Sequence, residues 1–369
     1  MAAELERLRA EEVAARRRAR LEVLVWQATN QCNLRCRHCF VTERPRDDLD
    51  TTAVRKVFDN VASGVDPSTV RVGISGGEAT LRQDLPEIVA HLAATGFSEV
   101  GLASNGFLLG QHPQQLDALV QAGLVSLNVS LDGPAHYHNE LRRHPQAYDL
   151  ALAALLHALR AHPEALDTTV TLTVAPGNLR TYPFVLDLVE QLGIRYVKMV
   201  AVMPFGEGAA NADLGLTDEQ FVRLLEDVAA RRASFAAQRT PMLVSMTCDG
   251  FLGRFEGSAR GGLFNCPAGV IVGAVLRDGR LSACAQLTQP FSVAGDLRRE
   301  PFERLWRDGF RELRERRWLR RGPCASCGEW RYCQGGSLHD RAPDGALLRC
   351  NALRIRRALE GRSGAPSAH

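Results

Sequence analysis

Short apolar segments alternate with amphipathic segments along most of the chain. Runs rich in β-branched residues predict strands, and the segments between them carry apolar residues at helical spacing. Such alternation favours parallel strands joined by right-handed helical crossovers. The chain is therefore predicted to be α/β, and periodicity alone leaves open a doubly wound sheet or a partial barrel. The predicted strands cover residues 21–28, 69–75, 98–104, 124–132, 168–176 and 195–203, and the predicted helices 51–64, 84–96, 112–123, 147–162 and 182–193.

The pattern changes after about residue 215. A longer helix is predicted at about 217–239, and a hairpin turn at Asp278-Gly279 lies between two apolar runs. The following residues lack long apolar stretches, so this segment needs a staple other than a hydrophobic core. We divide the chain into five parts on this basis. They are an N-terminal helix (1–20), a core (21–215), a linking helix (216–244), a C-terminal segment (245–358) and a disordered tail (359–369).

Composition narrows the class of protein. Apolar residues make up 45% of the chain and charged residues 24%, and no apolar run is long enough to span a bilayer. The charged N-terminal segment cannot serve as a secretory signal, so we expect a cytoplasmic protein without a membrane partner. A net charge of +3 is too small to indicate nucleic-acid binding. In the cytoplasm, clustered cysteines among the ten present are metal ligands or redox groups rather than disulfides.

Three cysteines lie within eight positions directly after the first predicted strand. Cys32, Cys36 and Cys39 in "CNLRCRHC" can hold three corners of a cubane iron–sulfur cluster and leave the fourth iron open to a ligand. A zinc site usually uses four protein ligands, and the fourth is missing here. Zinc binding or accident stays open on this motif alone.

The second predicted strand ends in "SGGEATL". Gly76 and Gly77 let a ligand approach the backbone, and Glu78 adds an acceptor at the strand end, where α/β folds place their ligands. An ordinary tight turn would explain the glycines, but not their coincidence with a three-cysteine loop on the neighbouring strand.

These two motifs together resemble the radical S-adenosylmethionine (radical SAM) superfamily, over residues 21 to about 210. The resemblance implies a partial (β/α)6 TIM-like barrel, a SAM-binding 4Fe–4S cluster on the three cysteines, and an external one-electron donor of the flavodoxin or ferredoxin type. It also implies that Gly76, Gly77 and Glu78 hold the methionyl amine of SAM. His38, Ser104, Asn105, Ser130 and Arg142 or Arg143 match positions that contact the rest of SAM. Glu207 stands where the family's sixth-strand turn often has arginine, and we expect no catalytic role for it.

The remaining seven cysteines match six of the seven positions of the SPASM domain, a C-terminal extension of radical SAM enzymes that holds two auxiliary clusters. The resemblance implies one complete auxiliary 4Fe–4S cluster on Cys324, Cys327, Cys333 and Cys350. At the seventh position stands Ser337, so the nearer cluster keeps Cys266 and Cys284, with Cys248 as the expected third ligand. Its fourth position is open, or filled by His339, Asp340, Ser337 or substrate. A zinc ribbon is the alternative for this segment, and Cys248 could instead be a core cysteine.

The resemblance implies an oxidoreductase that cleaves SAM reductively to a 5′-deoxyadenosyl radical and abstracts hydrogen from its substrate. The motif "CQGGSLH" looks more like peptide maturases than tetrapyrrole enzymes, so we expect oxidative modification or cross-linking of a ribosomally synthesised peptide. A haem-pathway enzyme and a non-catalytic zinc protein are the alternatives. Only one helix precedes the first strand, so a leader peptide would have to bind a separate protein, or the barrel and SPASM surfaces.

Overall fold

The computed structural model describes residues 2–41, 43–45, 47–239, 241–287 and 289–363. Its centre is one ten-stranded sheet in the order β10-β9-β8-β1-β2-β3-β4-β5-β6-β7. Strands β1 to β7 are parallel to their neighbours and β8 is parallel to β1, whereas β9 and β10 run antiparallel. The strands are Val23–Gln27, Arg71–Ser75, Glu99–Ser104, Ser126–Ser130, Asp167–Val174, Tyr196–Ala201, Leu243–Met246, Val272–Val275, Arg280–Ser282 and Val293–Asp296.

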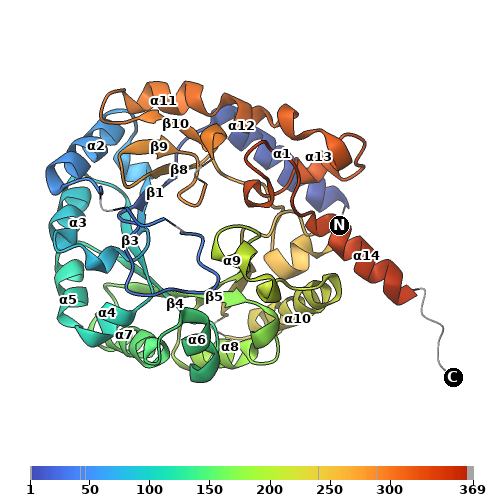
Figure 1. The fold of residues 1–369 in the computed structure, drawn as a ribbon, viewed down its shortest axis with the longest axis horizontal. Helices are drawn as coiled ribbons and strands as arrows, with labels where there is room; N and C mark the ends of the chain where they lie inside the picture. Colours follow the sequence, from blue (N-terminus) through green and yellow to red (C-terminus); the bar gives the residue numbers. More distant parts are fainter. Residues whose placement is uncertain (1, 42, 46, 240, 288, 364–369) are drawn as a thin grey trace.

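The helices form an outer ring around the curved sheet (Figure 1). Because the sheet has two edges, at β10 and β7, the barrel is partial rather than closed. This confirms the predicted α/β class and the six predicted strands, and it selects the barrel over the doubly wound sheet. The barrel helices are α2 (Thr51–Ser63), α3 (Leu85–Ala94), α4 (Phe107–Gln111), α5 (Gln114–Gln121), α6 (Ala135–Arg142), α7 (Ala147–Ala161), α8 (Tyr182–Gln191), α9 (Glu207–Ala210) and α10 (Asp218–Ala236).

The hydrophobic core lies between the strands and the outer helices. Alternate residues of β2, β3, β4 and β6 are buried on this side, as the side-chain period of two requires. Trp26 of β1 packs edge-to-face on Phe58 of α2, with ring centroids 5.9 Å apart, and Phe58 meets Phe97 in the same way at 6.1 Å. The other face of the sheet, inside the barrel, is left for polar side chains.

The C-terminal segment extends the barrel sheet at both edges. Strand β7 continues it beyond β6, and the predicted hairpin at Asp278-Gly279 is present as β8 and β9, with β8 paired to β1. The predicted boundary at residue 245 therefore falls inside β7. The helices of this segment are α11 (Phe302–Gly309), α12 (Arg311–Glu315), α13 (Trp330–Cys333) and α14 (Asn351–Ser363).

Helix α1 (Ala2–Arg18) lies beside the helices of the C-terminal segment (Figure 1). This helix, predicted as residues 1–20, packs there because Glu6 accepts hydrogen bonds from Tyr332 and Arg331. Helix α14 extends to Ser363, so residues 359–363 are helical and the prediction of a tail from 359 is wrong for them. Residues 364–369 of the predicted tail lie outside the described residues.

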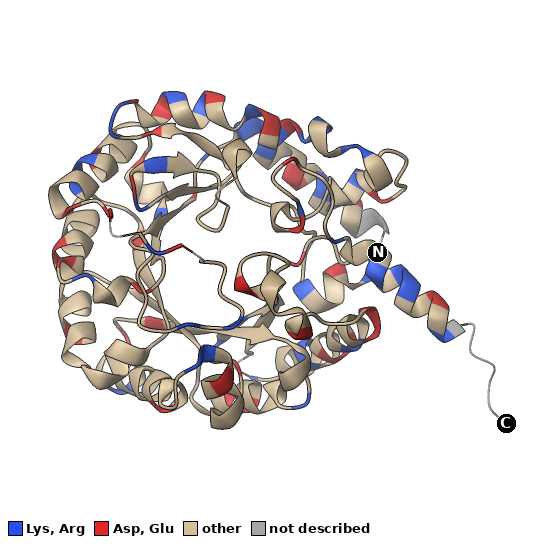
Figure 2. Ribbon diagram, in the orientation of Figure 1, with Lys and Arg blue, Asp and Glu red and all other residues tan. Residues whose placement is uncertain are grey.

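Positive and negative side chains are interspersed along the outer helices (Figure 2). Many of them form ion pairs within or between neighbouring helices, such as Arg55 with Glu87. Every helix in the described ranges is too short or too polar to cross a bilayer.

Candidate functional site

The loop that follows β1 carries three cysteines at the carboxyl end of the barrel strands. Cys32, Cys36 and Cys39 are each partly buried, and their thiols are close enough that a charge on one raises the pKa of another. Burial has the larger effect and raises the pKa of Cys36 to about 11. Metal binding releases the proton of a thiol, so three converging thiols form a donor set that suits an iron–sulfur cluster.

Backbone contacts hold this cysteine loop on two sides. The N–H of Arg37 donates to the carbonyl of Leu141 at the end of α6, and the N–H of Glu207 donates to the carbonyl of Cys39, both at 2.8 Å. Gly206 has φ +62°, and a Cβ there would lie 2.6 Å from the carbonyl oxygen of Cys39. The turn after β6 therefore touches the cysteine loop through backbone, and Glu207 contributes its N–H to this contact.

The glycines after β2 allow a second close backbone contact. A Cβ on Gly76, which has φ +143°, would lie 2.4 Å from the carbonyl oxygen of Thr29, and one on Gly77 would lie 2.2 Å from that of Gln31. The N–H of Gly77 donates to the Thr29 carbonyl at 2.7 Å. The Gly76–Gly77 turn and the start of the cysteine loop thus pack backbone against backbone, which a side chain would prevent.

Glu78 joins the ends of β2 and β3. Its carboxylate accepts hydrogen bonds from the Ser104 hydroxyl (2.8 Å), the Asn105 N–H (2.8 Å) and the Thr80 hydroxyl (2.7 Å). The residue is 1% exposed, and burial raises its pKa although these donors oppose the shift. The predicted second-strand and third-strand residues therefore form one network.

Asn105 connects that network to the cysteine loop. Its side-chain amide donates to Asn33 Oδ1 at 2.9 Å and lies 3.8 Å from Cys32 Sγ, which also accepts from the Leu34 N–H at 3.4 Å. The buried Nδ2 of Asn33 has no partner within the described residues. Amide donors directed at sulfur stabilise a thiolate ligand, so these contacts suit a metal-bound Cys32.

Arg142 lies at the site, whereas Arg143 faces away from it. Helix α6 ends at Arg142, and Arg143 adopts a left-handed conformation (φ +55°) that leaves its side chain exposed. Arg142 is 5% exposed and donates to Asp132 at 2.7 Å. Its charge lowers the pKa of Cys36, in opposition to burial. Burial alone would raise the pKa of Asp132, but Arg142 and His138 hold it well below its usual range.

His38 and Ser130 complete the predicted positions. Burial lowers the pKa of His38 to about 4, so the ring is neutral near pH 7, and its buried Nδ1 has no partner in the described ranges. An orphaned buried nitrogen beside three thiols is consistent with a ligand that the chain itself does not supply. Ser130 is partly buried at the end of β4.

The inner wall of the barrel carries a lysine that sequence reasoning missed. Val197 and Met199 of β6 are fully buried on the helix side, so Lys198 between them points into the barrel, where it is exposed. It pairs in register with Thr171 of β5, which in turn pairs with Ser130. Within the described residues Lys198 has no acidic partner. The alternation of Val-Lys-Met in the sequence was the available signal.

Three further cysteines meet where the C-terminal segment covers the barrel. Cys248 follows β7, Cys266 precedes β8 and Cys284 follows β9. Burial raises the pKa of Cys284 to about 12, and the nearby thiol of Cys266 adds to this shift. Burial and the thiols of Cys284 and Cys266 also raise the pKa of Cys248. Cys248 has φ +61°, a strained conformation for a side chain of this kind. We call Cys248, Cys266 and Cys284 the nearer set, because they match the SPASM cluster that is nearer to the radical SAM cluster.

The four cysteines of the distal set are Cys324, Cys327, Cys333 and Cys350. A small cavity is lined by Cys324, Cys333 and Cys350. Burial, and then Cys350, raise the pKa of Cys333 to about 12. The Arg341 guanidinium donates to Cys324 Sγ at 3.4 Å. Three thiols around a cavity, a fourth on Cys327 close enough to raise the pKa of Cys333, and a cationic donor to one sulfur suit a cluster that carries negative charge.

Asp117, His157 and His162, on outer helices, form a compact group of possible metal ligands in the described part of the chain, with ligand atoms all within 4.8 Å of one another. Both histidines bond to one Asp117 oxygen at 2.7 Å, which accounts for their closeness.

Comparison with known proteins agrees with this geometry. Residues 26–181 match the model of the Radical SAM superfamily. Residues 26–181 therefore form a radical SAM domain; the superfamily implies a 4Fe–4S cluster and S-adenosylmethionine.

Two known proteins are similar to this chain in sequence, and one solved structure is similar to it in fold. The chain is 28% identical over 317 residues to the Fe-coproporphyrin III synthase of Methanosarcina barkeri, covering 79% of this chain and 75% of that protein. It is 29% identical over 329 residues to the mycofactocin maturase MftC of Mycobacterium tuberculosis, covering 85% and 78%. Native anSMEcpe, solved with bound AdoMet and Cp18Cys peptide, shares the fold with a TM-score of 0.71 at 17% identity, covering 92% and 95%.

Proposed function

We propose that the protein oxidatively modifies or cross-links a ribosomally synthesised peptide, with S-adenosylmethionine as cosubstrate. One observation carries most of the proposal: the three-cysteine loop is packed against the Gly76–Gly77 turn and the Glu78 network at the mouth of a partial barrel. The similarity to MftC supports a peptide substrate, and so does the fold shared with anSMEcpe, which was solved with a bound peptide.

Cys32, Cys36 and Cys39 would hold the SAM-binding 4Fe–4S cluster. When bound and reduced, this group supplies the electron that cleaves S-adenosylmethionine and yields the 5′-deoxyadenosyl radical that attacks substrate. The chain's own contribution is to hold three thiolates in one loop and to leave one side of that loop free. The contacts of Asn105 and the Leu34 N–H with Cys32 orient the first of these ligands.

The surrounding network would bind and orient S-adenosylmethionine. The Gly76–Gly77 turn offers backbone carbonyl groups to the methionyl amine. The carboxylate of Glu78 is already bonded to donors in the chain, so we assign it the role of fixing that turn and Asn105. Ser130 and the buried guanidinium of Arg142 would meet polar groups of the cosubstrate, and the neutral ring of His38 would meet its adenine.

Lys198 would bind an anionic group of the substrate. Its ammonium lies on the inner wall, level with Ser130, and has no acidic partner within the described chain. A cation without an acidic partner on the inner wall of the barrel favours an anionic group such as a carboxylate, because an ammonium donates charge-assisted hydrogen bonds to it.

The nearer and distal sets would hold two auxiliary clusters. Their place beside the barrel suits the removal of one electron from the substrate radical that hydrogen abstraction leaves. The substrate would then lose two electrons in all while SAM is cleaved to methionine and 5′-deoxyadenosine, and the electron that started the cleavage would be returned. An external donor of the flavodoxin or ferredoxin type would supply the first electron. A leader peptide would be bound by a separate protein or by the surface of the barrel and the C-terminal segment.

A tetrapyrrole substrate is the second candidate, favoured by the similarity to Fe-coproporphyrin III synthase. The propionates of such a substrate would also suit Lys198. The test is an oxygen-free incubation of reconstituted enzyme, dithionite and SAM with either a candidate precursor peptide, chosen from short reading frames near its gene, or an iron tetrapyrrole that is a precursor of Fe-coproporphyrin III. We expect the peptide to increase 5′-deoxyadenosine formation and to change mass. A response to the porphyrin alone would replace the peptide proposal with the second candidate.

A further inference from the structure

Two arginines are buried in the C-terminal segment without a carboxylate partner. Arg316 is 1% exposed and Arg341 is 2% exposed, and neither forms an ion pair with an acidic side chain in the described part of the chain. A guanidinium in a protein keeps its charge. Because a charge that is buried among neutral groups is strongly destabilising, we expect an anionic partner beside each of these two arginines.

The guanidinium of Arg341 reaches the distal set. Its Nη2 donates to the carbonyl of Gly335 at 2.8 Å and to Cys324 Sγ at 3.4 Å, and its Nη1 donates to the carbonyl of Gly345 at 3.3 Å. The two carbonyl groups are neutral and fix the plane of the guanidinium. The sulfur of Cys324 is therefore the acceptor that can carry a negative charge.

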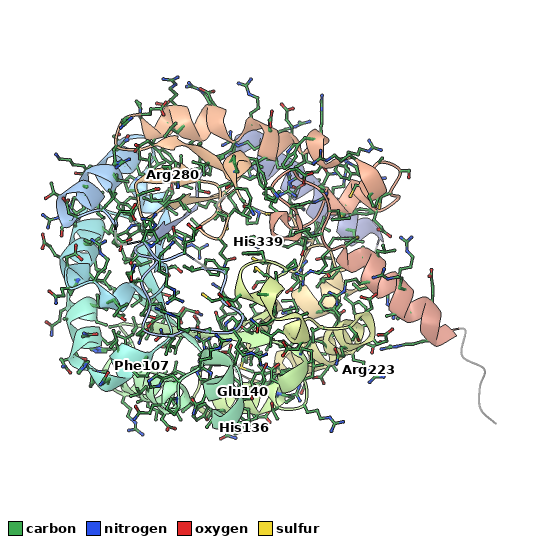
Figure 3. The ribbon with its side chains drawn as sticks, in the orientation of Figure 1. Phe107, His136, Glu140, Arg223, Arg280 and His339 are labelled. Carbon is green, nitrogen blue, oxygen red and sulfur yellow. The ribbon has the colours of Figure 1, made fainter. Side chains whose placement is uncertain are left out.

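The acid next to Arg341 in the chain is engaged elsewhere. Asp340 accepts from Arg349 Nε at 2.8 Å, and both residues are largely buried in this ion pair. Figure 3 shows His339 of the same turn beside α9, on the side of the C-terminal segment that faces the barrel. Arg341 thus continues from a turn that lies inside the molecule, where solvent does not screen its charge.

Arg316 connects the nearer set with the loop that follows Cys333. Its Nη2 donates to the carbonyl of Cys266 at 3.1 Å, and its Nη1 donates to the carbonyl of Gly336 at 2.8 Å. The third nitrogen, Nε, is buried and has no partner within the described residues. One cation therefore lies at the backbone of both cysteine sets.

The N-terminal helix does not neutralise Arg316. Glu12 and Arg16 of α1 both lie close enough to act on Arg316, and they form an ion pair with each other. Their opposite charges largely cancel at Arg316. The anionic partner of Arg316 is therefore to be sought in the cysteine sets.

We propose that Arg341 and Arg316 are the counter-charges of the distal and nearer auxiliary clusters and that they raise the reduction potentials of these clusters. The inference rests on the proposed auxiliary clusters and names the residues that tune them. Uptake of one electron from the substrate radical adds one negative charge, and a fixed cation nearby stabilises the reduced state more than the oxidised state. A hydrogen bond to a ligand sulfur acts in the same direction. Both arginines thus favour acceptance of the electron that substrate oxidation releases.

The experiment measures reduction potentials in full-length enzyme that is reconstituted without oxygen. In redox titrations followed by electron paramagnetic resonance, the distal signal is the one lost in Cys333→Ala, and the nearer signal is the one lost in Cys284→Ala. Arg341→Gln should make one-electron reduction of the distal cluster about tenfold less favourable, which lowers its potential by about 59 mV. Arg316→Gln should have its larger effect on the nearer cluster.

The matched control is Arg55→Gln, which removes the same charge from the outer face of α2, where Arg55 pairs with Glu87. Both potentials should stay constant in this variant. Each buried variant also serves as a control for the other, because a general loosening of the segment would shift both signals equally. Unchanged potentials in Arg341→Gln and Arg316→Gln, with full iron, would overturn the proposal.

A second measurement decides the case in which a glutamine variant fails to hold its cluster. Arginine is supplied with 15N, and pulsed electron paramagnetic resonance of the reduced distal cluster should detect a weak nitrogen coupling through the hydrogen bond to Cys324. The coupling should be lost in Arg341→Lys, which keeps the charge and should keep part of the potential. The absence of this coupling in enzyme with full iron would overturn the assignment of Arg341.

Iron analysis separates this proposal from the proposed function. About four iron atoms are expected for each cluster. Iron for the SAM-binding cluster alone, with no signal that Cys333→Ala or Cys284→Ala removes, would overturn the auxiliary clusters themselves. Full iron with unshifted potentials would leave those clusters standing and remove the role of the two arginines.

Discussion

The cysteine loop after β1 and the nearer set of the C-terminal segment collect their sulfur ligands in different ways. Cys32, Cys36 and Cys39 come from one loop, and one strand end positions all three. Cys248 follows β7 at one edge of the sheet, whereas Cys266 precedes β8 and Cys284 follows β9 on the other side of β1. The segment between β7 and β8 brings them together. A local loop leaves one side of its donor set free for a cosubstrate. A set gathered from several segments is enclosed by those segments.

The largest expected effect comes from removing one ligand in each region. Cys36→Ala should lower SAM cleavage by at least about 100-fold, because the cluster that binds SAM loses one of three ligands. Cys284→Ala should lower iron by about one cluster and abolish substrate modification, while SAM cleavage continues. The measurements are iron content and 5′-deoxyadenosine by chromatography. Equal loss of SAM cleavage in both variants would contradict the assignment of SAM cleavage to the cysteine loop and of substrate oxidation to the nearer set.

A smaller effect is expected at the network that orients the cosubstrate. Glu78→Gln should raise the KM for SAM by roughly 10-fold to 100-fold, because the carboxamide keeps one acceptor oxygen and cannot hold Ser104 and Asn105 together. Initial rates of SAM cleavage at several SAM concentrations measure this. Unchanged kinetics with unchanged iron would remove Glu78 from the site.

Replacing Lys198 tests whether the inner wall of the barrel binds the substrate rather than SAM. Lys198→Ala should raise the KM for substrate about tenfold, since a hydrogen bond to a charged group contributes about 1.5 to 3 kcal/mol. Lys198→Arg should restore part of the loss, and Lys56→Ala on α2 serves as the matched control. SAM cleavage without substrate should stay constant. A fall in that basal rate for Lys198→Ala would mean that the lysine serves the cosubstrate instead.

The smallest expected effect concerns stability at low pH. Burial, and then Arg142, lower the pKa of His138 to about 3, whereas the unfolded value is about 6.5. Between these values the unfolded chain binds a proton that the folded chain does not, so stability falls as the pH drops below about 6.5. His38 and His339 act in the same direction. The thermal midpoint should therefore fall between pH 7 and 5, and less steeply in His138→Gln. Parallel curves would contradict the assigned cause.

The sequence was most informative where chemistry is local. The spacing of Cys32, Cys36 and Cys39 lies within one loop, and the alternation of apolar runs predicts the six barrel strands, which are present. The choice between Arg142 and Arg143 needed the end of α6, where a left-handed residue turns Arg143 outward. The role of Glu78 as a junction depends on the register of β2 and β3, and the contact of His339 with Cys284 depends on packing across 55 residues of chain. Sequence spacing does not specify such distances.

The central claim is that the three cysteines after β1 hold a cluster with one iron open to S-adenosylmethionine. Its most direct test uses oxygen-free enzyme in which Cys266, Cys284, Cys324 and Cys333 are replaced by alanine, so that the signal of one cluster is observed. The electron paramagnetic resonance spectrum of the reduced protein should shift when S-adenosylmethionine is added. An identical spectrum with and without saturating cosubstrate would contradict the claim.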